Sequence, residues 1–537
     1  MKVAVIASPY PLEEAPAPPL GVTYIAAAFE AAGAEVKVLD YIVSRYSPEK
    51  LAQELEAFQP DFVGGTSVTM NFPVAAAIIQ KVKEINPSIV TAMGGPHVTF
   101  DAEDTLRSYP GIDLLVLGEG EKTVAELLPV IHDREAWPEV KGIAFLEDNR
   151  FVRTDPRGLI QDLETIPLPA RHLLPISRYQ ALGFPVSIIT SRGCPYQCIF
   201  CQGRRMVGHK VRYRQPLSVV DEMEEILSYG FTRINVADDL FLSNKARARA
   251  ICEEILRRDL EVAWSAFVRV NIMDADVMRL MRRAGCDSVS FGIETGSPEM
   301  LKLIRKRITL DQGRRAVEIC REVGLTPHAS FMVGLPGESP ETLRQTQEYA
   351  ESLEMIYGYH VLAPLPGTTV REEIDQYDLE ILTNDWSLYD ANRPVARTSQ
   401  LSAEQIQAFV DEFERQNNIH WEDMKERHRQ GKATPNEGLR VEGQDRLEFT
   451  FRLLSEDILE EHGRFPSNDH PTDAGSQEAL LTAKIAQVTG AKSELVKRII
   501  RDFISRGYLE ASVKGDTFEW KWAPSKKVPT EACSSMT

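Results

Sequence analysis

The stretch that decides the fold is VSIITSRGCPYQCIFC, residues 186–201. It opens with a β-branched run that predicts a buried strand, and it continues into a loop carrying Cys194, Cys198 and Cys201. Three thiolates from one short loop can bind three irons of a [4Fe-4S] cluster, and because no fourth cysteine lies nearby, one iron stays open. A zinc site is the main alternative, although structural zinc takes four ligands, usually from paired CxxC knuckles.

Downstream of this stretch, strand and helix patterns alternate. Six strand candidates follow one another: VSIITS, RINVAD, VAWSAFV, SVSFGIE, HASFMVG and GYHVLAP. This rhythm predicts a partial (β/α)6 barrel over residues 186–375, two units short of the usual eight. Because barrel chemistry takes place at the carboxyl ends of the strands, the cysteine loop lies at the active end.

Upstream, residues 1–150 also alternate between short β-branched runs and helical patterns. This alternation predicts a doubly wound, Rossmann-like domain, so the whole chain is of the α/β class. Ligands of such domains bind beyond the carboxyl ends of the strands, where the loops here are rich in Gly, Ser, Thr and Pro. Residues 151–185 contain many Pro and Arg residues without a sustained period, and they are predicted to be a connector.

The remaining third of the chain loses the β/α rhythm. Residues 376–440 are predicted to form a mostly helical extension, with a long amphipathic helix over 402–426. Residues 441–525 suggest a winged-helix-like domain that ends in a hairpin turning at Gly515 and Asp516. Its helix over 492–506 carries five basic and two acidic residues, so DNA contact stays open, although packing against protein is favoured. Residues 526–537 are predicted to be disordered.

Composition narrows the function further. The 537 residues contain 61 Lys and Arg against 79 Asp and Glu, a net charge of −18. Such a chain repels a phosphate backbone, so nucleic acid is not expected as a main partner. Seven cysteines are too few for a disulfide framework and fit a reducing cytoplasm. The N-terminus lacks a signal-peptide pattern, and no stretch predicts a transmembrane span.

A CxxxCxxC loop after the first strand of a partial barrel resembles the radical S-adenosylmethionine superfamily. The resemblance implies that the open iron binds S-adenosylmethionine, whose reductive cleavage gives a 5'-deoxyadenosyl radical. It assigns Phe200 to the adenine, Asp238 to the methionine amine, Glu294 to the ribose and Gly334 to the nucleoside. The usual Gly-Gly-Glu form is absent around Asp238. Core packing of Phe200 and a solvated Glu294 remain alternatives.

Four N-terminal segments, PPLGVTYIAAAFEAAG, DFVGGTSVTM, GGPHVT and GEGE, resemble, in order, those of radical S-adenosylmethionine proteins with a cobalamin-binding domain. PLPGTT at residues 364–369 is typical of the same group, so the resemblance covers residues 1–375. It implies that small residues let the flat corrinoid lie against backbone. The implied cobalamin contacts are Ser67, Thr69, Gly94, Gly95, His97, Gly118 and Glu119.

The resemblance implies methyl transfer to an unactivated carbon, using a [4Fe-4S] cluster, S-adenosylmethionine and cobalamin. Radical cyclisation or rearrangement, as in anaerobic porphyrin-ring cyclases, is the alternative, and a corrinoid-sensing regulator is a third hypothesis. The implied partners are a small-molecule substrate, with lipids and tetrapyrroles as candidates, and an electron donor such as a ferredoxin or flavodoxin. No catalytic residue beyond the cofactor contacts is assigned.

The lower face of the cobalt can also be addressed from the sequence. Corrinoid proteins with a histidine ligand carry Asp-x-His-x-x-Gly after the first strand, but the corresponding segment here, PYPLEEAPAPPLG, contains no histidine. The first histidine of the chain is His97, in a loop that the resemblance does not associate with the axial ligand. We therefore expect cobalamin to bind base-off without a histidine ligand. Among the other cysteines, Cys252, Cys286 and Cys320 are interpreted as small buried apolar residues.

Overall fold

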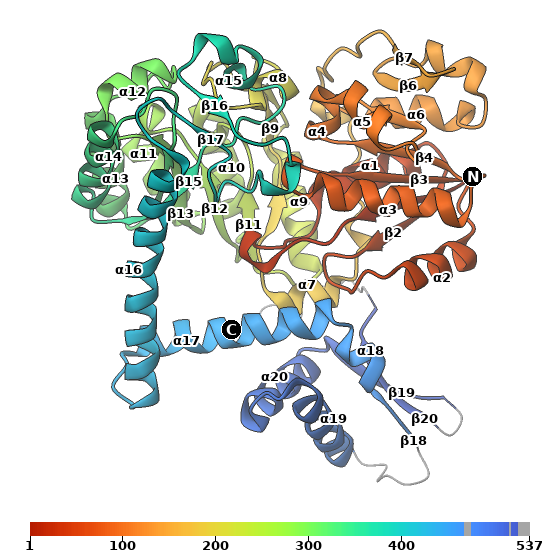
Figure 1. The fold of residues 1–537 in the computed structure, drawn as a ribbon. Coiled ribbons are helices and arrows are strands. Elements are labelled where there is room, and N and C mark those ends of the chain that lie inside the picture. Colours follow the sequence, from red (N-terminus) through yellow and green to blue (C-terminus); the bar gives the residue numbers. More distant parts are fainter. Residues whose placement is uncertain (467–473, 515–516, 525–537) are drawn as a thin grey trace.

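The N-terminal domain is built on a sheet of seven strands with the order β2-β1-β3-β4-β5-β6-β7. The computed structural model describes residues 1–466, 474–514 and 517–524 (Figure 1). The first five strands are parallel and the last two antiparallel. Their bounds are β1 (Lys2–Ala7), β2 (Glu35–Asp40), β3 (Phe62–Thr66), β4 (Val90–Gly94), β5 (Leu114–Val116), β6 (Ile143–Glu147) and β7 (Arg150–Arg153). The order 2-1-3-4-5 is that of flavodoxin-like doubly wound folds, which confirms the predicted class.

Helices cover both faces of this sheet. One face packs with α1 (Leu20–Ala31) and α6 (Glu121–Leu127), and the other with α2 (Pro48–Phe58), α3 (Phe72–Ile85), α4 (Pro96–Phe100) and α5 (Ala102–Ser108). The interior strand β1 is almost wholly buried because apolar residues fill both of its faces, as a sheet covered on both sides requires.

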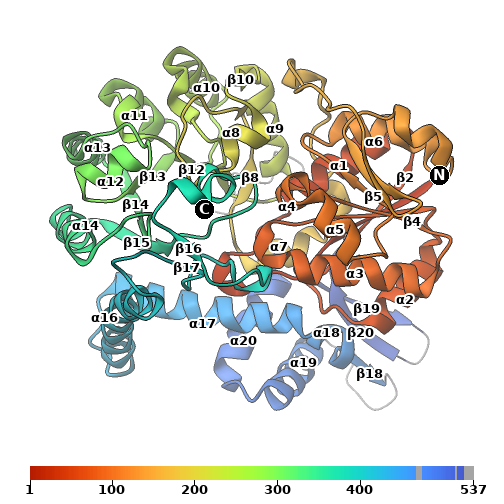
Figure 2. The ribbon, with the colours of Figure 1, turned by 45° about the horizontal axis from the view of Figure 1, so that its top comes forward.

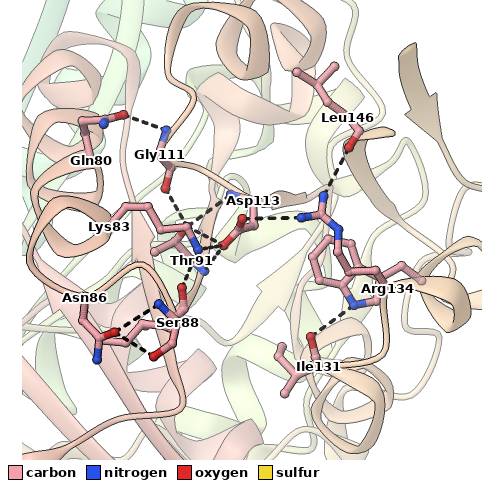
Figure 3. Close-up of polar contacts among 12 residues, drawn as sticks. Gln80, Lys83, Asn86, Ser88, Thr91, Gly111, Asp113, Ile131, Arg134 and Leu146 are labelled. Carbon is pink, nitrogen blue, oxygen red and sulfur yellow. Dashed lines mark hydrogen bonds and ion pairs between the residues drawn. The ribbon is translucent and has the colours of Figure 1, made fainter. Parts of the chain in front are cut away.

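A polar cluster locks the edge of this sheet at the amino ends of β4 and β5 (Figure 3). Asp113, just before β5, accepts hydrogen bonds from the Thr91 backbone N–H at 2.9 Å and from Lys83 Nζ at 2.5 Å. Gln80 on α3 accepts one from the Gly111 N–H at 2.7 Å. These contacts hold β4 and β5 together at their amino ends. The carboxyl ends, on the opposite side of the sheet, are left free for a ligand.

The second domain is a six-stranded parallel sheet with the order β15-β14-β13-β12-β11-β8, which confirms the predicted partial barrel. The strands are β8 (Val186–Ile188), β11 (Arg233–Val236), β12 (Ala263–Phe267), β13 (Cys286–Glu294), β14 (Thr326–Val333) and β15 (Ile356–Val361). The helices between and around them are α7 (Ile176–Leu182), α8 (Gly203–Val207), α9 (Pro216–Ser228), α10 (Lys245–Arg257), α11 (Ala275–Arg283), α12 (Pro298–Leu303), α13 (Leu310–Val323) and α14 (Pro340–Ser352). A small antiparallel pair, β9 (Ser191–Arg192) and β10 (Arg212–Tyr213), flanks the cysteine loop.

The segment after the barrel differs from the predicted helical extension. After α15 (Thr369–Glu372), the chain forms an antiparallel pair, β16 (Glu380–Ile381) and β17 (Ala396–Arg397), before α16 (Ala403–Arg429) begins. Asp385 caps a single 3-10 turn, Trp386–Leu388, by accepting a hydrogen bond from the Ser387 N–H, and the described residues between α15 and α16 form no α-helix. The helical prediction is therefore wrong for residues 376–402, whereas the long helix expected over 402–426 is present.

The C-terminal region has the winged-helix-like order that was expected, with one strand more than the predicted hairpin. Its elements are α17 (Pro435–Ser455), α18 (Ile458–His462), β18 (Arg464–Pro466), α19 (Ala474–Thr489), α20 (Ser493–Ser505), β19 (Leu509–Lys514) and β20 (Thr517–Trp522). The strands pair as β18-β20-β19. The predicted Gly-Asp turn and the tail over 526–537 lie outside the described residues. On α20 and its end, Arg498, Arg501 and Arg506 form ion pairs with acids of the same region.

This region packs beneath both α/β domains (Figures 1 and 2). Asp457, before α18, accepts hydrogen bonds from Lys50 Nζ at 2.7 Å and from the Arg45 N–H at 3.1 Å of the N-terminal domain. Ser177 on α7 donates to the Ala523 carbonyl at 2.8 Å. Within the described part of the chain, every helix is too short or too polar to cross a membrane.

Candidate cofactor site between the two α/β domains

A cavity of about 410 Å³ lies where the carboxyl edge of the first sheet meets the start of the barrel. Glycines supply much of the wall on the N-terminal side: Gly64, Gly65, Gly94, Gly95, Gly118 and Gly120. The barrel contributes Ser191, Arg192, Gly203, Met206 and Asp239. Because both domains form the wall, a ligand of this cavity lies between them, beside Gly203, which is two residues after Cys201.

Gly95 shows why small residues are required here. Its φ is +101°, and a Cβ at this position would lie 2.6 Å from the Ser67 carbonyl oxygen. The loops after β3 and β4 therefore touch through backbone. Ser67 is buried, and its Oγ finds no hydrogen-bond partner among the described residues. A flat group edged with amides fits both features, since it needs backbone approach and offers hydrogen bonds.

The seven residues predicted to contact cobalamin divide into two groups. Gly94, Gly95, Gly118 and Glu119 line the cavity, whereas Ser67, Thr69 and His97 lie outside its lining. His97 is fully buried, stacks on Phe72 at 3.9 Å and meets Trp386 edge-on at 5.1 Å. Burial, with the charge of Arg371, lowers the pKa of His97 to about 4. This side chain thus belongs to the contact between α3, α4 and the segment after the barrel.

Glu119 is engaged by the barrel. Its carboxylate accepts two hydrogen bonds from Arg212, at 2.9 and 2.8 Å, and one from Arg192 at 3.2 Å. Glu121 binds the other terminal nitrogen of Arg192 at 2.5 Å. All four side chains are at most 10% exposed. We call Glu119, Glu121, Arg192 and Arg212 the interdomain clamp; sequence reasoning missed it because its partners are 71 to 93 residues apart.

The cysteine loop is fastened at both ends. The Cys194 N–H donates to the Gly208 carbonyl at 3.0 Å, and the Ile199 N–H donates to the Ile304 carbonyl at 3.2 Å. Burial raises the pKa of the Cys201 thiol to about 11, and the charges of Cys198, Asp239 and Cys194 add to this effect. A cysteine whose ionisation is opposed in this way suits a cationic occupant that binds it as a thiolate.

Donor chemistry favours a cluster over a single metal ion. Structural zinc takes four protein ligands, whereas this loop supplies three thiols. A cluster bound by one cysteine per iron can keep one iron open for a further ligand. Arg269 lies beside this loop, with Nη1 3.9 Å from Cys198 Sγ and its guanidinium over Tyr196.

Neighbouring carboxylates after β11 have different surroundings. Asp238 is buried and accepts four hydrogen bonds, two each from Thr190 and Ser191, at 2.5 to 3.0 Å. It therefore anchors the strand end that carries the cysteine loop. Asp239 lines the cavity instead, and burial with the charge of Asp238 raises its pKa. The sequence singled out Asp238, and the adjacent Asp239 is the carboxylate that faces the cavity.

Glu294 ends β13 with φ at +75° and is 7% exposed, so it is not solvated. Its Oε1 accepts a hydrogen bond from Lys306 Nζ at 2.6 Å. The same ammonium lies 5.9 Å from the Phe200 ring, which packs beside Ile199 and Leu335. Lys306 was not predicted, although the basic run RKR at residues 305–307 was a visible signal.

Gly334 directly follows β14, with φ at +76°. Its N–H donates to Glu338 Oε2 at 2.6 Å, so the turn after the strand is closed by a buried carboxyl group. Of the cysteines outside the cysteine loop, Cys252, Cys286 and Cys320 are wholly buried, as expected for small apolar residues.

Comparisons with known proteins agree with this architecture. The B12 binding domain family matches residues 14–128, and the Radical SAM superfamily matches residues 188–350. The uncharacterized methyltransferase PH0819 of Pyrococcus horikoshii is 35% identical over 72% of this chain and 85% of its own length. The anaerobic magnesium-protoporphyrin IX monomethyl ester cyclase of Cereibacter sphaeroides is 30% identical over 72% of this chain and 64% of its own length.

Among solved structures, the cobalamin-dependent S-adenosylmethionine radical enzyme OxsB with aqua-cobalamin bound has the same fold. It superposes with a TM-score of 0.68 at 17% identity and covers 94% of this chain and 84% of its own. Two family matches in the same order as the two α/β domains, together with a relative similar over most of its length, establish the relationship. The chain belongs to the radical S-adenosylmethionine proteins that carry a cobalamin-binding domain.

Proposed function

We propose that this enzyme transfers a methyl group to an unactivated carbon of a small molecule, with cobalamin in the 410 Å³ cavity and a [4Fe-4S] cluster on the cysteine loop. One observation supports this most strongly. Asp239 and Gly203, which flank Cys201, also line the cavity whose other wall is the glycine-rich edge of the first sheet. Both cofactor positions therefore open onto one space, where a substrate carbon can meet both.

In this proposal, Cys194, Cys198 and Cys201 bind the cluster, and Arg269 offsets thiolate charge beside Cys198. When bound, the cluster and S-adenosylmethionine supply a carbon-centred radical, and cobalamin supplies the methyl group. Asp239 receives the amine of S-adenosylmethionine, because it is the carboxylate at the cavity wall. Glu294, held by Lys306, accepts hydrogen bonds from ribose hydroxyls, and Phe200 and Gly334 lie against the nucleoside.

On the other wall, Gly94, Gly95 and Gly118 let the corrinoid approach backbone, and Ser67, outside the lining, belongs to the loop after β3 that packs against Gly95. Thr69 and His97 support this loop from behind, since His97 Nδ1 lies 3.3 Å from Thr69 Oγ1. Glu119 acts through the interdomain clamp. The clamp fixes how far the corrinoid lies from the cysteine loop, and separation of reacting groups strongly affects rate.

The reaction needs a low-potential electron donor, such as a ferredoxin or flavodoxin, and a reducing compartment such as the cytoplasm. The cyclase named among the relatives makes radical ring closure the second candidate. Methyl transfer is favoured because PH0819, at 35% identity, is named a methyltransferase and is matched over more of its length.

An assay with methyl-labelled S-adenosylmethionine distinguishes methyl transfer from radical cyclisation. The enzyme is reconstituted anaerobically with iron, sulfide and cobalamin and is then incubated with cell extract and methyl-labelled S-adenosylmethionine. Methyl transfer predicts 5'-deoxyadenosine together with a labelled small-molecule product. 5'-Deoxyadenosine with an unlabelled, altered product would indicate cyclisation or rearrangement. The absence of 5'-deoxyadenosine with full cluster occupancy would refute the radical enzyme and favour a corrinoid sensor.

A further inference from the structure

A surface groove of about 710 Å³ lies between the end of α12 and the start of α13. Its floor is apolar, with Leu301, Ile308 and Leu310 among its residues. Three cationic side chains, Lys302, Arg305 and Arg307, also line it and are exposed. We call this the basic groove.

The cations of the basic groove lack acidic partners. On the adjacent helices α13 and α14, Arg315 pairs with Glu318 and Arg344 with Glu341. By contrast, Lys302, Arg305 and Arg307 form no ion pair within the described ranges of the chain. Asp311 is the acidic member of the lining, so the groove keeps a net positive charge. A cleft lined by one sign of charge concentrates its field at the opening.

The backbone presents these side chains outward. Arg305 and Arg307 have φ values of +56° and +55°, a region that residues with a Cβ seldom adopt. Between them, Lys306 turns inward to Glu294, 2.6 Å away. The two arginines therefore face solvent, while the lysine between them binds the buried carboxylate of Glu294. Backbone strain of this kind gathers at functional segments.

This segment lies directly against the cysteine loop. The Arg305 carbonyl oxygen is 4.0 Å from Cys198 Sγ, and the Ile304 carbonyl accepts the Ile199 N–H at 3.2 Å. No further layer of chain separates the groove backbone from Cys198. In both views, α12 lies on the side of the barrel away from the N-terminal domain (Figures 1 and 2). An occupant of the groove would thus leave the cavity between the domains open.

We propose that the basic groove docks an acidic, low-potential one-electron carrier of the flavodoxin type. The proposal rests on the cluster assignment above and adds where the electron enters. The carrier is oxidised by one electron and the cluster is reduced by one, with no atom transferred. Because the chain carries a net charge of −18, most of its surface repels an acidic protein, and the groove guides the carrier to the side where Cys198 lies.

The test compares two reductants in the reconstituted holoenzyme. The variant Lys302→Glu/Arg305→Glu/Arg307→Glu is assayed for 5'-deoxyadenosine with reduced flavodoxin and, separately, with dithionite, a small reductant that needs no docking site. The flavodoxin-driven rate should fall roughly tenfold or more, and the dithionite-driven rate should not change. The control Arg440→Glu/Lys492→Glu/Lys497→Glu alters the same number of exposed charges in the C-terminal region and should leave both rates unchanged.

Salt gives a second, mutation-free measurement. Raising ionic strength should slow the flavodoxin-driven reaction of the unmodified enzyme and spare the dithionite-driven one, because docking depends on opposite charges. An unchanged flavodoxin-driven rate in the groove variant, or salt independence of that rate, would overturn the proposal. Lack of 5'-deoxyadenosine from the unmodified enzyme with both reductants would instead refute the radical function.

Discussion

Arg212 of the barrel holds Glu119 of the N-terminal domain with both terminal nitrogens, at 2.9 and 2.8 Å, in a site where each side chain is about 5% exposed or less. Burial alone would raise the pKa of Glu119, but the hydrogen bonds from Arg212 and the Ile160 N–H, with the charge of Arg192, lower it. A paired charge in this position links the two cofactor-binding domains at the level of the cavity.

Replacing Glu119 with Gln should therefore destabilise the protein strongly. The change leaves Arg212 and Arg192 buried without full compensation, a loss of about 3–5 kcal/mol for a broken buried pair. Chemical denaturation measures it. Glu126→Gln is the control. Glu126 pairs with Arg157, but its own side chain is 55% exposed, and ion pairs at the surface contribute about 0–1 kcal/mol. Equal losses for both variants would contradict the clamp.

Replacing Cys194, Cys198 or Cys201 with Ala should abolish cluster assembly and 5'-deoxyadenosine formation while cobalamin binding survives. The reason is that the glycine-rich wall of the cavity belongs to the other domain. Iron and cobalamin content of the purified variants measure both effects. Cys252→Ala is the control, since this buried thiol lies on α10 away from the cavity lining. Loss of cobalamin from all three loop variants would contradict the two-site arrangement.

Removing the charge of Asp238 and removing that of Asp239 should have different effects. Asp238→Asn leaves some of the four donors from Thr190 and Ser191 unpaired, at about 1–3 kcal/mol for each buried group, so stability and iron content should fall. Asp239→Asn should keep iron but bind S-adenosylmethionine about tenfold more weakly, because a charge-assisted hydrogen bond is lost. Iron assays and equilibrium dialysis separate the two outcomes, and matching phenotypes would reject this division of roles.

The cobalt should lack a histidine ligand. His97 stacks on Phe72 and meets Trp386 edge-on, outside the cavity lining. Electron paramagnetic resonance of the Co(II) state should show no nitrogen superhyperfine splitting, in the unmodified protein and in His97→Leu alike. The same variant should lose about 1–3 kcal/mol of stability, because a buried aromatic contact is removed. Three-line splitting that vanishes in His97→Leu would make His97 a ligand after all.

Glu338 should make stability depend on pH. Burial raises its pKa from 4.5 to about 8, against the hydrogen bonds from Gly334 and Leu335 that lower it. The folded state thus retains a proton that the unfolded state has released. Its stabilising contribution is complete below pH 4.5 and is lost as pH rises through about 8, by at most about 5 kcal/mol.

Unfolding curves between those limits should show the unmodified protein losing stability relative to Glu338→Gln, which cannot ionise. Glu341→Gln is the matched control, because this exposed residue sits at the start of the next helix. A constant difference between the unmodified protein and Glu338→Gln across the range would show that Glu338 does not hold a proton in the folded state.

Local patterns in the sequence predicted most of the secondary structure and the fold of the two α/β domains. Alternating β-branched runs and helical periods depend on neighbouring residues, and they predicted the doubly wound sheet, the six-stranded barrel and the long helix after it. The helical prediction was wrong for residues 376–402 because two short strands of this segment pair with each other, Glu380 with Arg397 and Ile381 with Ala396, and such pairing is not visible in local periodicity.

The sequence by itself determined which residue types are available: three cysteines on one loop and glycines at successive strand ends, both fixed by spacing along the chain. Only the tertiary structure decided which neighbour lines the cavity, Asp239 and not Asp238, and that His97 lies outside the lining. It alone revealed the clamp from Glu119 to Arg212 and the pair of Lys306 with Glu294. Such choices depend on burial and on charges that meet across domains and strand ends, which no local pattern records.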